Sequence, residues 1–290
     1  MTQTDQWLSK LTRQLTPRLR GMGRVSEQLR RYYSRKYQDH PDRKQVIRDF
    51  DGDIAITLDR SRYISSQVYW SGLFERDVLS ILDQLLEPES VMLDIGANIG
   101  VMTLYAAKRV PRGRVLSFEP MPDNYAELEA NRRLNGFEQV RTFNLALGEA
   151  DGEVEMFTSN DLEQHHGFNE GLYSLYASEF RSSKSARVRL AQLDHIVAQE
   201  GLTRVDVIKI DVEGAELGVL KGGIATLRRF HPALILEYNP EAYKSADYQA
   251  SDLFDLLSAL SYQFAALGPR GERLELPVNR FTPGCNVYCF

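Results

Sequence analysis

One stretch, Val91 to Gly100 with the sequence VMLDIGANIG, most constrains what this chain can fold into. The apolar run Val91–Leu93 predicts a buried strand, and a helical pattern starts at Val101. A strand, a glycine turn and a helix in this order form the first half of a βαβ unit. Gly96 and Gly100 allow a tight turn and the close approach of a ligand that a Cβ would block. The amide groups that begin the helix would point at that ligand.

The spacing of this turn differs from that of a dinucleotide-binding turn. A Gly-x-Gly-x-x-Gly motif would need glycine at Asn98, and Gly100 falls one residue too early for the third glycine. Asp94 at the strand end would also repel a pyrophosphate. A ligand with a cationic or polar end fits better, such as the amino-acid part of S-adenosylmethionine. A turn that merely links strand to helix is the alternative.

A second acidic residue lies at the C-terminal end of the next predicted strand, Arg114–Pro120. Glu119 ends this strand, and its offset from Asp94 is close to the roughly 20 residues at which a carboxylate meets a ribose diol. A solvated glutamate at a strand end is the alternative interpretation. Together with the glycine turn, Glu119 predicts a nucleoside-binding site.

The third predicted strand, Val140–Ala146, supplies candidates for the adenine end of the ligand. A small residue at such a strand end lets an aromatic ring lie against the backbone, which indicates Asn144 and Ala146. The candidate cofactor-binding residues are therefore Asp94, Gly96, Asn98, Gly100, Glu119, Asn144 and Ala146.

Further acids follow the fourth and fifth predicted strands, Val205–Ile210 and Ala233–Glu237. The carboxyl ends of parallel strands meet at one edge of a sheet, where such folds bind ligands. Asp211 is the best candidate for orienting a sulfonium, positioning an acceptor or taking its proton, with Glu213 and Glu237 beside it. Asp211, Glu237 and the nearby Asn239 also resemble the divalent-metal ligands of catechol-type O-methyltransferases, and oxygen ligands suit magnesium.

An irregular stretch from Asn160 to Ser185 interrupts the regular pattern. Long structureless segments inside a regular domain are often functional, so this one is a candidate lid over the acceptor. His165 or His166 within it is a candidate general base, and His166 is the one we favour. Two exposed loop histidines are the alternative.

Three motifs in order resemble the FkbM family of S-adenosylmethionine-dependent methyltransferases. They are Leu93–Gly100 (LDIGANIG), Phe118–Pro120 (FEP) and Ile208–Glu216 (IKIDVEGAE), within a resemblance that covers about residues 74–240. The family resemblance implies methyl transfer from S-adenosylmethionine, mostly to hydroxyl groups of sugars and natural products. It also implies no metal site as a rule, so a divalent cation is the less favoured cofactor.

The expected fold is α/β, with a Rossmann-like, seven-stranded, mostly parallel sheet of the class I methyltransferase type over residues 51–290. A helical appendage over residues 1–50 precedes it, with Leu8, Leu11, Leu15 and Leu19 at helical spacing and a second helix at Ser26–Tyr37. This appendage is a solvated extension, a dimerisation or partner-docking arm, or a contact to an anionic acceptor or membrane surface.

Composition limits the other classes of function. A net charge of −5 argues against a general nucleic-acid binder, and no run of 18 apolar residues predicts a membrane span. The chain start lacks an apolar signal core, and Cys285 and Cys289 indicate reduced thiols, so we expect a cytoplasmic protein. Two functions compete with methyl transfer: a catalytically silent binding module, and a nicotinamide-dependent oxidoreductase. The glycine spacing and the lack of a Tyr-x-x-x-Lys pair disfavour the oxidoreductase.

Overall fold

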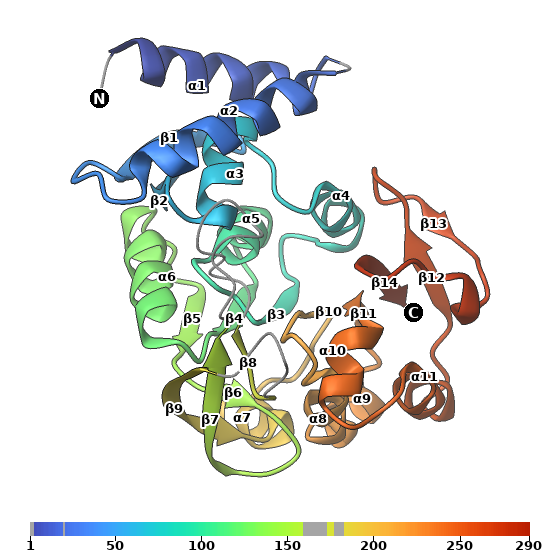
Figure 1. The fold of residues 1–290 in the computed structure, drawn as a ribbon. Helices are drawn as coiled ribbons and strands as arrows, with labels where there is room; N and C mark the ends of the chain where they lie inside the picture. The colour runs from blue at the N-terminus through green and yellow to red at the C-terminus, as the bar shows by residue number, and fades with distance from the viewer. Residues whose placement is uncertain (1–2, 20, 159–172, 177–182) are drawn as a thin grey trace. The chain divides into compact units, whose positions relative to one another are not determined.

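The computed structural model describes residues 3–19, 21–158, 173–176 and 183–290 (Figure 1). These residues form two compact units. The first comprises residues 1–75 with 133–136, and the second comprises residues 76–132, 137–160 and 173–290, where described. Each unit is taken in turn.

The second unit is built on one large sheet with the strand order β13-β12-β14-β11-β10-β3-β4-β5. The five strands from β11 to the edge strand β5 run parallel, and β14, β12 and β13 pair antiparallel with their neighbours. The strands are β3 Val91–Ile95, β4 Arg114–Phe118, β5 Val140–Phe143, β10 Val207–Ile210, β11 Ala233–Tyr238, β12 Phe264–Leu267, β13 Arg273–Leu274 and β14 Cys285–Cys289. The predicted Rossmann-like, mostly parallel sheet is confirmed, with the two-residue β13 added at its edge.

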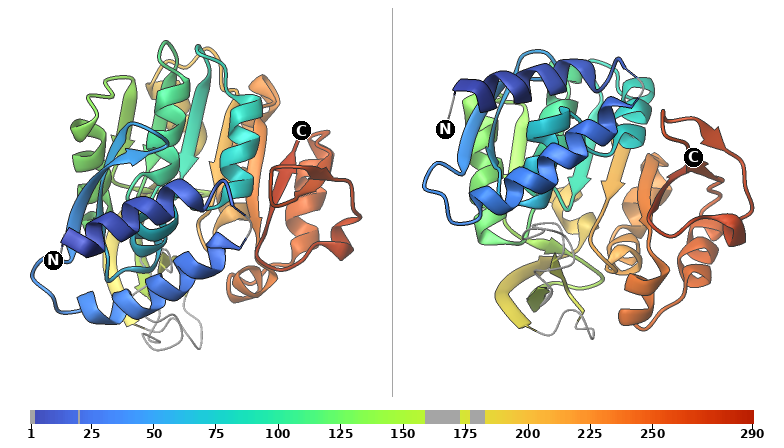
Figure 2. Two further views of the ribbon diagram at one scale, coloured as in Figure 1. Left: turned by 90° about the horizontal axis from the view of Figure 1, so that it is seen from above. Right: turned by 45° about the horizontal axis from the view of Figure 1, so that its top comes forward.

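Helices cover both faces of this sheet (Figure 2). They are α4 Arg76–Leu85, α5 Val101–Arg109, α6 Pro122–Leu134, α7 Leu193–Gln199, α8 Glu216–Lys221, α9 Ile224–Phe230, α10 Pro240–Ser245 and α11 Ala250–Ala259, with the 3₁₀ turn η1 Val278–Arg280. Alternate strand residues such as Leu93 and Ile208 form one core with Ile196 of α7 and Leu257 of α11. Successive side chains on a strand point to opposite faces of the sheet. Asp94, the neighbour of Leu93, and Lys209, the neighbour of Ile208, therefore lie on the other face.

A second, smaller sheet carries the strand order β6-β9-β7-β8. Its strands are β6 Ala146–Leu147, β7 Gly152–Thr158, β8 Tyr173–Ser174 and β9 Ser183–Ala191. The predicted third strand was wrong at its end, because Ala146 lies in this sheet and pairs with Leu190. The chain leaves the large sheet at Asn144, whose side-chain amide donates to the carbonyls of Glu119 and Pro120, 2.9 Å each.

The first unit combines two helices, a β-hairpin and a third helix. These elements are α1 Gln3–Leu15, α2 Met22–Tyr37, β1 Lys44–Phe50, β2 Ile54–Asp59 and α3 Tyr63–Ser71. The segment Tyr63–Trp70 is helical within α3 and buries Ile64 and Val68 at helical spacing. The side-chain amide of Asn135 donates to the carbonyl of Ala55, and its Oδ1 accepts from the Ala55 N–H.

The expected boundary near residue 50 falls inside this unit, between the paired strands β1 and β2. The division of the chain into an appendage and a catalytic domain therefore stays a proposal. No helix in the described parts of the chain has the length and apolar character needed to cross a membrane.

Candidate cofactor and acceptor site

The glycine turn after β3 has the geometry that its sequence predicts. The N–H groups of Gly96 and Ala97 both donate to the carbonyl of Phe118, at 3.0 and 2.9 Å. Gly96 has φ +85°, and a Cβ there would lie 1.9 Å from the carbonyl oxygen of Asp211. Gly100 has φ +93°, and its Cβ would lie 2.7 Å from the Leu128 side chain. Both positions therefore require glycine, and the turn brings the end of β3 against Asp211.

Asp94 is fully buried on β3, on the sheet face that α5 covers. Its Oδ2 accepts a hydrogen bond of 2.6 Å from Thr103 Oγ1, which also lies 2.8 Å from Ser117 Oγ. Its Oδ1 is buried and has no hydrogen-bond partner among the described residues. Burial raises the pKa of Asp94, and the nearby positive charge of Lys209 opposes that rise.

Lys209 is a site residue that the sequence reasoning missed. It is buried on β10, directly opposite Asp94 on β3, and its Nζ donates to Asp211 Oδ2 at 3.1 Å. A lysine in the middle of the apolar strand Val207–Ile210 was the available signal, because buried charges are almost always paired. Lys209 therefore lies between the predicted cofactor acid and the predicted acceptor-side acid.

Glu119 closes the glycine turn through its carboxylate. Oε2 accepts from the N–H of Asn98 at 2.8 Å, and Oε1 accepts from the N–H of Met121 at 2.9 Å. Burial raises the pKa of Glu119 to about 7. Asn98 has φ +51°, and its own Oδ1 accepts from the N–H of Ile99 at 2.8 Å. The binding of ribose by Glu119 and of the cofactor by Asn98 stay predictions.

Asn144 and Ala146, the predicted adenine neighbours, follow strand β5 in the chain. The Asn144 side chain is exposed but is tied by its amide to the Glu119 and Pro120 carbonyls. Ala146 is buried in a small apolar cluster with Met121. Their adenine contacts stay predictions, and Asn144 already has a role in the backbone turn.

Three predicted acceptor-side acids come together at the carboxyl edge of the sheet. Carboxylate oxygens of Asp211, Glu213 and Glu237 all lie within 4.8 Å of one another, and all three residues are half-buried. The N–H of Asp211 donates to the carbonyl of Ile95 at 3.0 Å, which fixes the strand end. Carboxylates this close repel one another unless a proton or cation is shared, and Lys209 supplies one positive charge beside Asp211.

Glu216, the last residue of the IKIDVEGAE motif, stabilises the turn between β10 and α8. Its Oε1 accepts from the N–H groups of Val212 and Gly214, at 3.3 Å each, and its Oε2 accepts from Tyr248 Oη at 3.1 Å. It is fully buried, and burial raises its pKa to about 7. Gly214 has φ +107° and would place a Cβ 2.8 Å from the Ala242 carbonyl, so this turn too requires glycine.

The two candidate histidines, His165 and His166, lie outside the described residues. The general-base role proposed for His166 and the lid proposed for Asn160–Ser185 therefore stay predictions. Among the described residues, Asp211, Glu213 and Glu237 form a cluster of candidate proton acceptors at the carboxyl edge.

The sheet order, the glycine turn after β3 and the acid that ends β4 define a class I methyltransferase fold. Comparison with known proteins agrees: the family described as Methyltransferase FkbM domain matches residues 94–264, more than half of the chain. The chain belongs to this family, which confirms the resemblance carried by the three motifs.

Several curated relatives are similar over much of this chain. The AMB antimetabolite synthetase AmbE of Pseudomonas aeruginosa is 30% identical over 238 residues, which cover 70% of this chain and 11% of AmbE. The 2-O-methyltransferase NoeI of Sinorhizobium fredii is 28% identical over 203 residues, 68% of this chain and 80% of NoeI. This chain therefore spans about a tenth of AmbE but most of NoeI.

A crystal structure of Methyltransferase FkbM from Methylobacillus flagellatus is similar at a TM-score of 0.45 with 14% identity. The similarity covers 92% of this chain and 59% of that chain.

Proposed function

We propose that this protein transfers a methyl group from S-adenosylmethionine to a hydroxyl of a sugar, glycan or natural-product acceptor. Family membership supports the reaction class. The names of three relatives support oxygen and sugar-like acceptors: the 2-O-methyltransferase NoeI, the 31-O-demethyl-FK506 methyltransferase FkbM of Streptomyces tacrolimicus, and the hexuronic acid methyltransferase AglP of Haloferax volcanii.

The observation that supports the cofactor assignment is the buried Oδ1 of Asp94, which has no hydrogen-bond partner among the described residues. It lies near the turn at Gly96, where a Cβ would not fit. A buried carboxylate oxygen without a donor is costly, so the site favours a ligand that brings a cationic donor to this strand end. The ammonium group of S-adenosylmethionine is such a donor. Asp94 and the turn from Gly96 to Gly100 would hold its methionine part, and Glu119 its ribose.

The bound cofactor supplies an activated methyl group with its own leaving group. The chain's task is then to position the acceptor oxygen and remove its proton. Asp211, Glu213 and Glu237, whose carboxylate oxygens lie within 4.8 Å of one another, would share this work, and Lys209 Nζ donates to Asp211 at 3.1 Å. Because the three acids share one edge, one can accept the proton while another orients an acceptor hydroxyl.

Titration calorimetry with S-adenosylmethionine and S-adenosylhomocysteine tests the cofactor, with NAD as the comparison ligand. The full chain should bind S-adenosylmethionine and S-adenosylhomocysteine in the micromolar range and should not bind NAD. Asp94→Asn keeps the shape of the side chain but removes its charge, so it should strongly weaken the binding of S-adenosylmethionine. Glu275→Gln at an exposed site should leave this binding unchanged. NAD binding would favour an oxidoreductase. Tight cofactor binding without turnover of any acceptor hydroxyl would favour a silent binding module.

A cytoplasmic location is part of the same proposal. Cys285 and Cys289 are free thiols, as is usual in a reducing compartment. Labelling of both thiols in unfolded protein, taken directly from cells, would support this location, whereas blocked thiols would contradict it.

A further inference from the structure

Helix α1 of the first unit has the reverse of the usual amphipathic arrangement, with its polar side buried. It buries the polar residues Asp5, Ser9, Thr12 and Arg13. Trp7, by contrast, is 64% exposed. The leucines at helical spacing, Leu8, Leu11 and Leu15, are only half-buried. An amphipathic helix normally points its apolar side at its own core, so this helix presents that side to something else.

The buried polar side of α1 is firmly held, which fixes the direction of the helix. The carboxylate of Asp5 accepts from Tyr33 Oη at 2.8 Å and from Tyr37 Oη at 3.3 Å, both on α2. The Arg13 guanidinium pairs with Asp49 on β1 and donates to the Tyr69 carbonyl on α3 at 2.8 Å. Rolling α1 over to bury Trp7 would break these buried contacts, at a cost of several kcal/mol.

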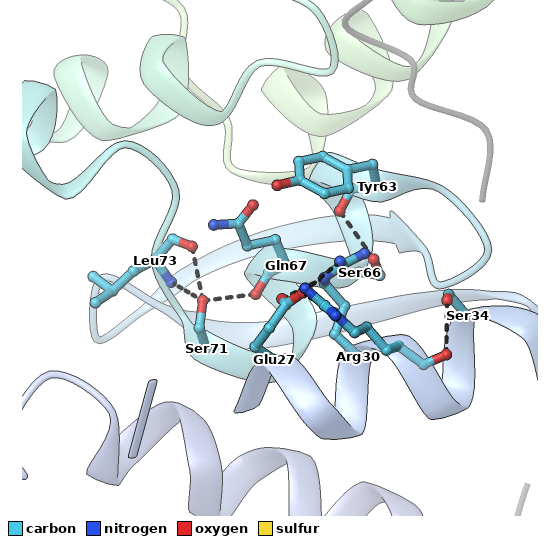
Figure 3. A network of polar contacts seen from close by, with 9 residues as sticks. Glu27, Arg30, Ser34, Tyr63, Ser66, Gln67, Ser71 and Leu73 are labelled. Carbon is cyan, nitrogen blue, oxygen red and sulfur yellow. Dashed lines mark hydrogen bonds and ion pairs between the residues drawn. The ribbon is translucent and has the colours of Figure 1, made fainter. Parts of the chain in front are cut away.

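Helix α2 repeats the arrangement beside α1 (Figure 2). It buries Ser26, Arg30 and Ser34 together with Tyr37. Figure 3 shows this polar side, where Arg30 pairs with Glu27, and the guanidinium lies 4.5 Å from the centre of the Tyr63 ring. The outward side carries Val25, Leu29 and Tyr32 at helical spacing, with Val25 43% and Tyr32 68% exposed.

The outward side of both helices is also strongly basic. Residues 1–37 carry nine Lys or Arg against two acids, a formal +7, whereas residues 38–290 carry −12. The two acids are engaged, Asp5 by the tyrosines and, at 3.9 Å, by Lys36, and Glu27 by Arg30 and Arg31. Six cations are exposed: Lys10, Arg18, Arg24, Arg31, Arg35 and Lys36.

We propose that this basic apolar face, formed by Trp7, Leu11, Leu19, Val25, Leu29 and Tyr32 with the six cations, docks on an anionic membrane surface. Apolar and aromatic side chains on a helix that lies in the membrane plane enter the headgroup region, while Lys and Arg between them pair with lipid phosphates. Long basic side chains bury their stems and keep the charge in the headgroup layer. The methyl acceptor of the second unit would then be sought near such a surface.

A second copy of the chain fits this face less well. A two-fold contact places the same patch on both sides, so the six cations of one copy would face those of the other. The two acids of residues 1–37 offset little of this repulsion, because Asp5 is buried and Glu27 is already paired with Arg30 and Arg31. An anionic lipid layer supplies the opposite charge over a continuous plane, which matches exposed cations spread over two helices.

Co-sedimentation of the full chain with vesicles tests the proposal. Vesicles of phosphatidylcholine and phosphatidylglycerol in equal parts should bind the protein, and vesicles of phosphatidylcholine alone should bind it much more weakly. High salt should reduce the binding. Arg18→Gln with Arg24→Gln should weaken it about 25-fold, from roughly fivefold per cation. Trp7→Ala with Tyr32→Ala should weaken binding to both vesicle types.

The matched control is Arg228→Gln with Leu276→Ala, one exposed cation and one exposed apolar residue of the second unit, which should leave vesicle binding unchanged. All four substituted residues of the face are exposed, so circular dichroism and thermal unfolding should match the parent protein. Folded protein that ignores the anionic vesicles would overturn the proposal. The proposal would also be overturned if the control pair weakened vesicle binding as much as the face variants do. A dimer in sedimentation velocity that the face variants dissociate would overturn it as well.

Discussion

The Nζ of Lys209 lies 3.1 Å from Oδ2 of Asp211, and the same lysine faces Asp94 across two parallel strands. One buried cation thus lies beside two carboxylates, Asp94, which we propose holds the cofactor, and Asp211, which we propose faces the acceptor. Its charge opposes the effect of burial on Asp94 and offsets the repulsion among the acids at the carboxyl edge. This arrangement makes Lys209 a positioning residue of the proposed reaction.

Replacing Lys209 should change the pH profile of methyl transfer as well as its rate. In Lys209→Met, Asp94 loses its positive neighbour, so its pKa rises further and the rising limb of the rate profile moves to higher pH. Removal of one partner from a buried ion pair also costs about 3–5 kcal/mol of stability. The pH–rate profile should be measured beside thermal unfolding, with the exposed Lys221→Met as control. A slower enzyme with an unmoved profile would reduce Lys209 to a purely structural role.

Gly96 should tolerate no side chain. Alanine at this site would place a Cβ 1.9 Å from the Asp211 carbonyl at a φ of +85°, so the turn must open or the strand end must shift. We expect Gly96→Ala to lose S-adenosylmethionine binding and several kcal/mol of stability. Gly201→Ala is the matched control, because its φ is +61° but nothing lies within 4 Å, so it should cost only about 1 kcal/mol. Equal losses in both variants would show that backbone strain alone matters at Gly96.

The strands and the glycine turn could be predicted because their signals are local. Alternating apolar residues mark Val207–Ile210, and Gly96 and Gly100 mark a turn whatever else surrounds them. The local sequence of Tyr63–Trp70 does not select a helix, because its mixture of apolar residues and serines fits a strand period as well as a helix period. Packing with α1 and α2 favours the helix that the structure has.

The parts of the site that could not be predicted depend on partners far along the chain. Thr103 reaches Asp94 only because α5 folds over β3, and Tyr248 reaches Glu216 from 32 residues away. Ala146 pairs with Leu190 in the second sheet, and the Asn144 amide donates to two carbonyls that follow β4 where the chain leaves the large sheet. Sequence spacing indicated which acids would meet at the carboxyl edge, but burial decided that Glu216 is a structural group and that Lys209 belongs to the site.

Methyl transfer should survive removal of divalent cations. Lys209 already places a positive charge beside Asp211, so the three acids can remain close with one shared proton rather than an ion. Turnover should persist in EDTA, and adding Mg²⁺ back should change it little. Glu237→Gln should reduce kcat about 10²–10⁴-fold if this acid takes the proton. Loss of turnover in EDTA with full recovery on Mg²⁺ would instead assign the cluster to a metal.

Glu216 should make the protein less stable as the pH rises toward neutrality. Its pKa is about 7 when folded against 4.5 as the ordinary value, so the folded state holds the proton more tightly. Its contribution to stability is therefore fully present below pH 4.5 and is lost as the pH rises to about 7, by about 3 kcal/mol.

Glu216→Gln cannot ionise, yet it keeps an oxygen that accepts from the N–H groups of Val212 and Gly214. Urea unfolding between pH 4.5 and 7 should show a smaller loss of stability in this variant than in the parent protein. Part of the slope should remain, because Glu119 titrates over the same window with the same sign. The exposed Glu275→Gln should leave the slope unchanged. If Glu216→Gln also leaves it unchanged, Glu216 is ionised in the folded protein well below pH 7, and the buried turn must stabilise its charge.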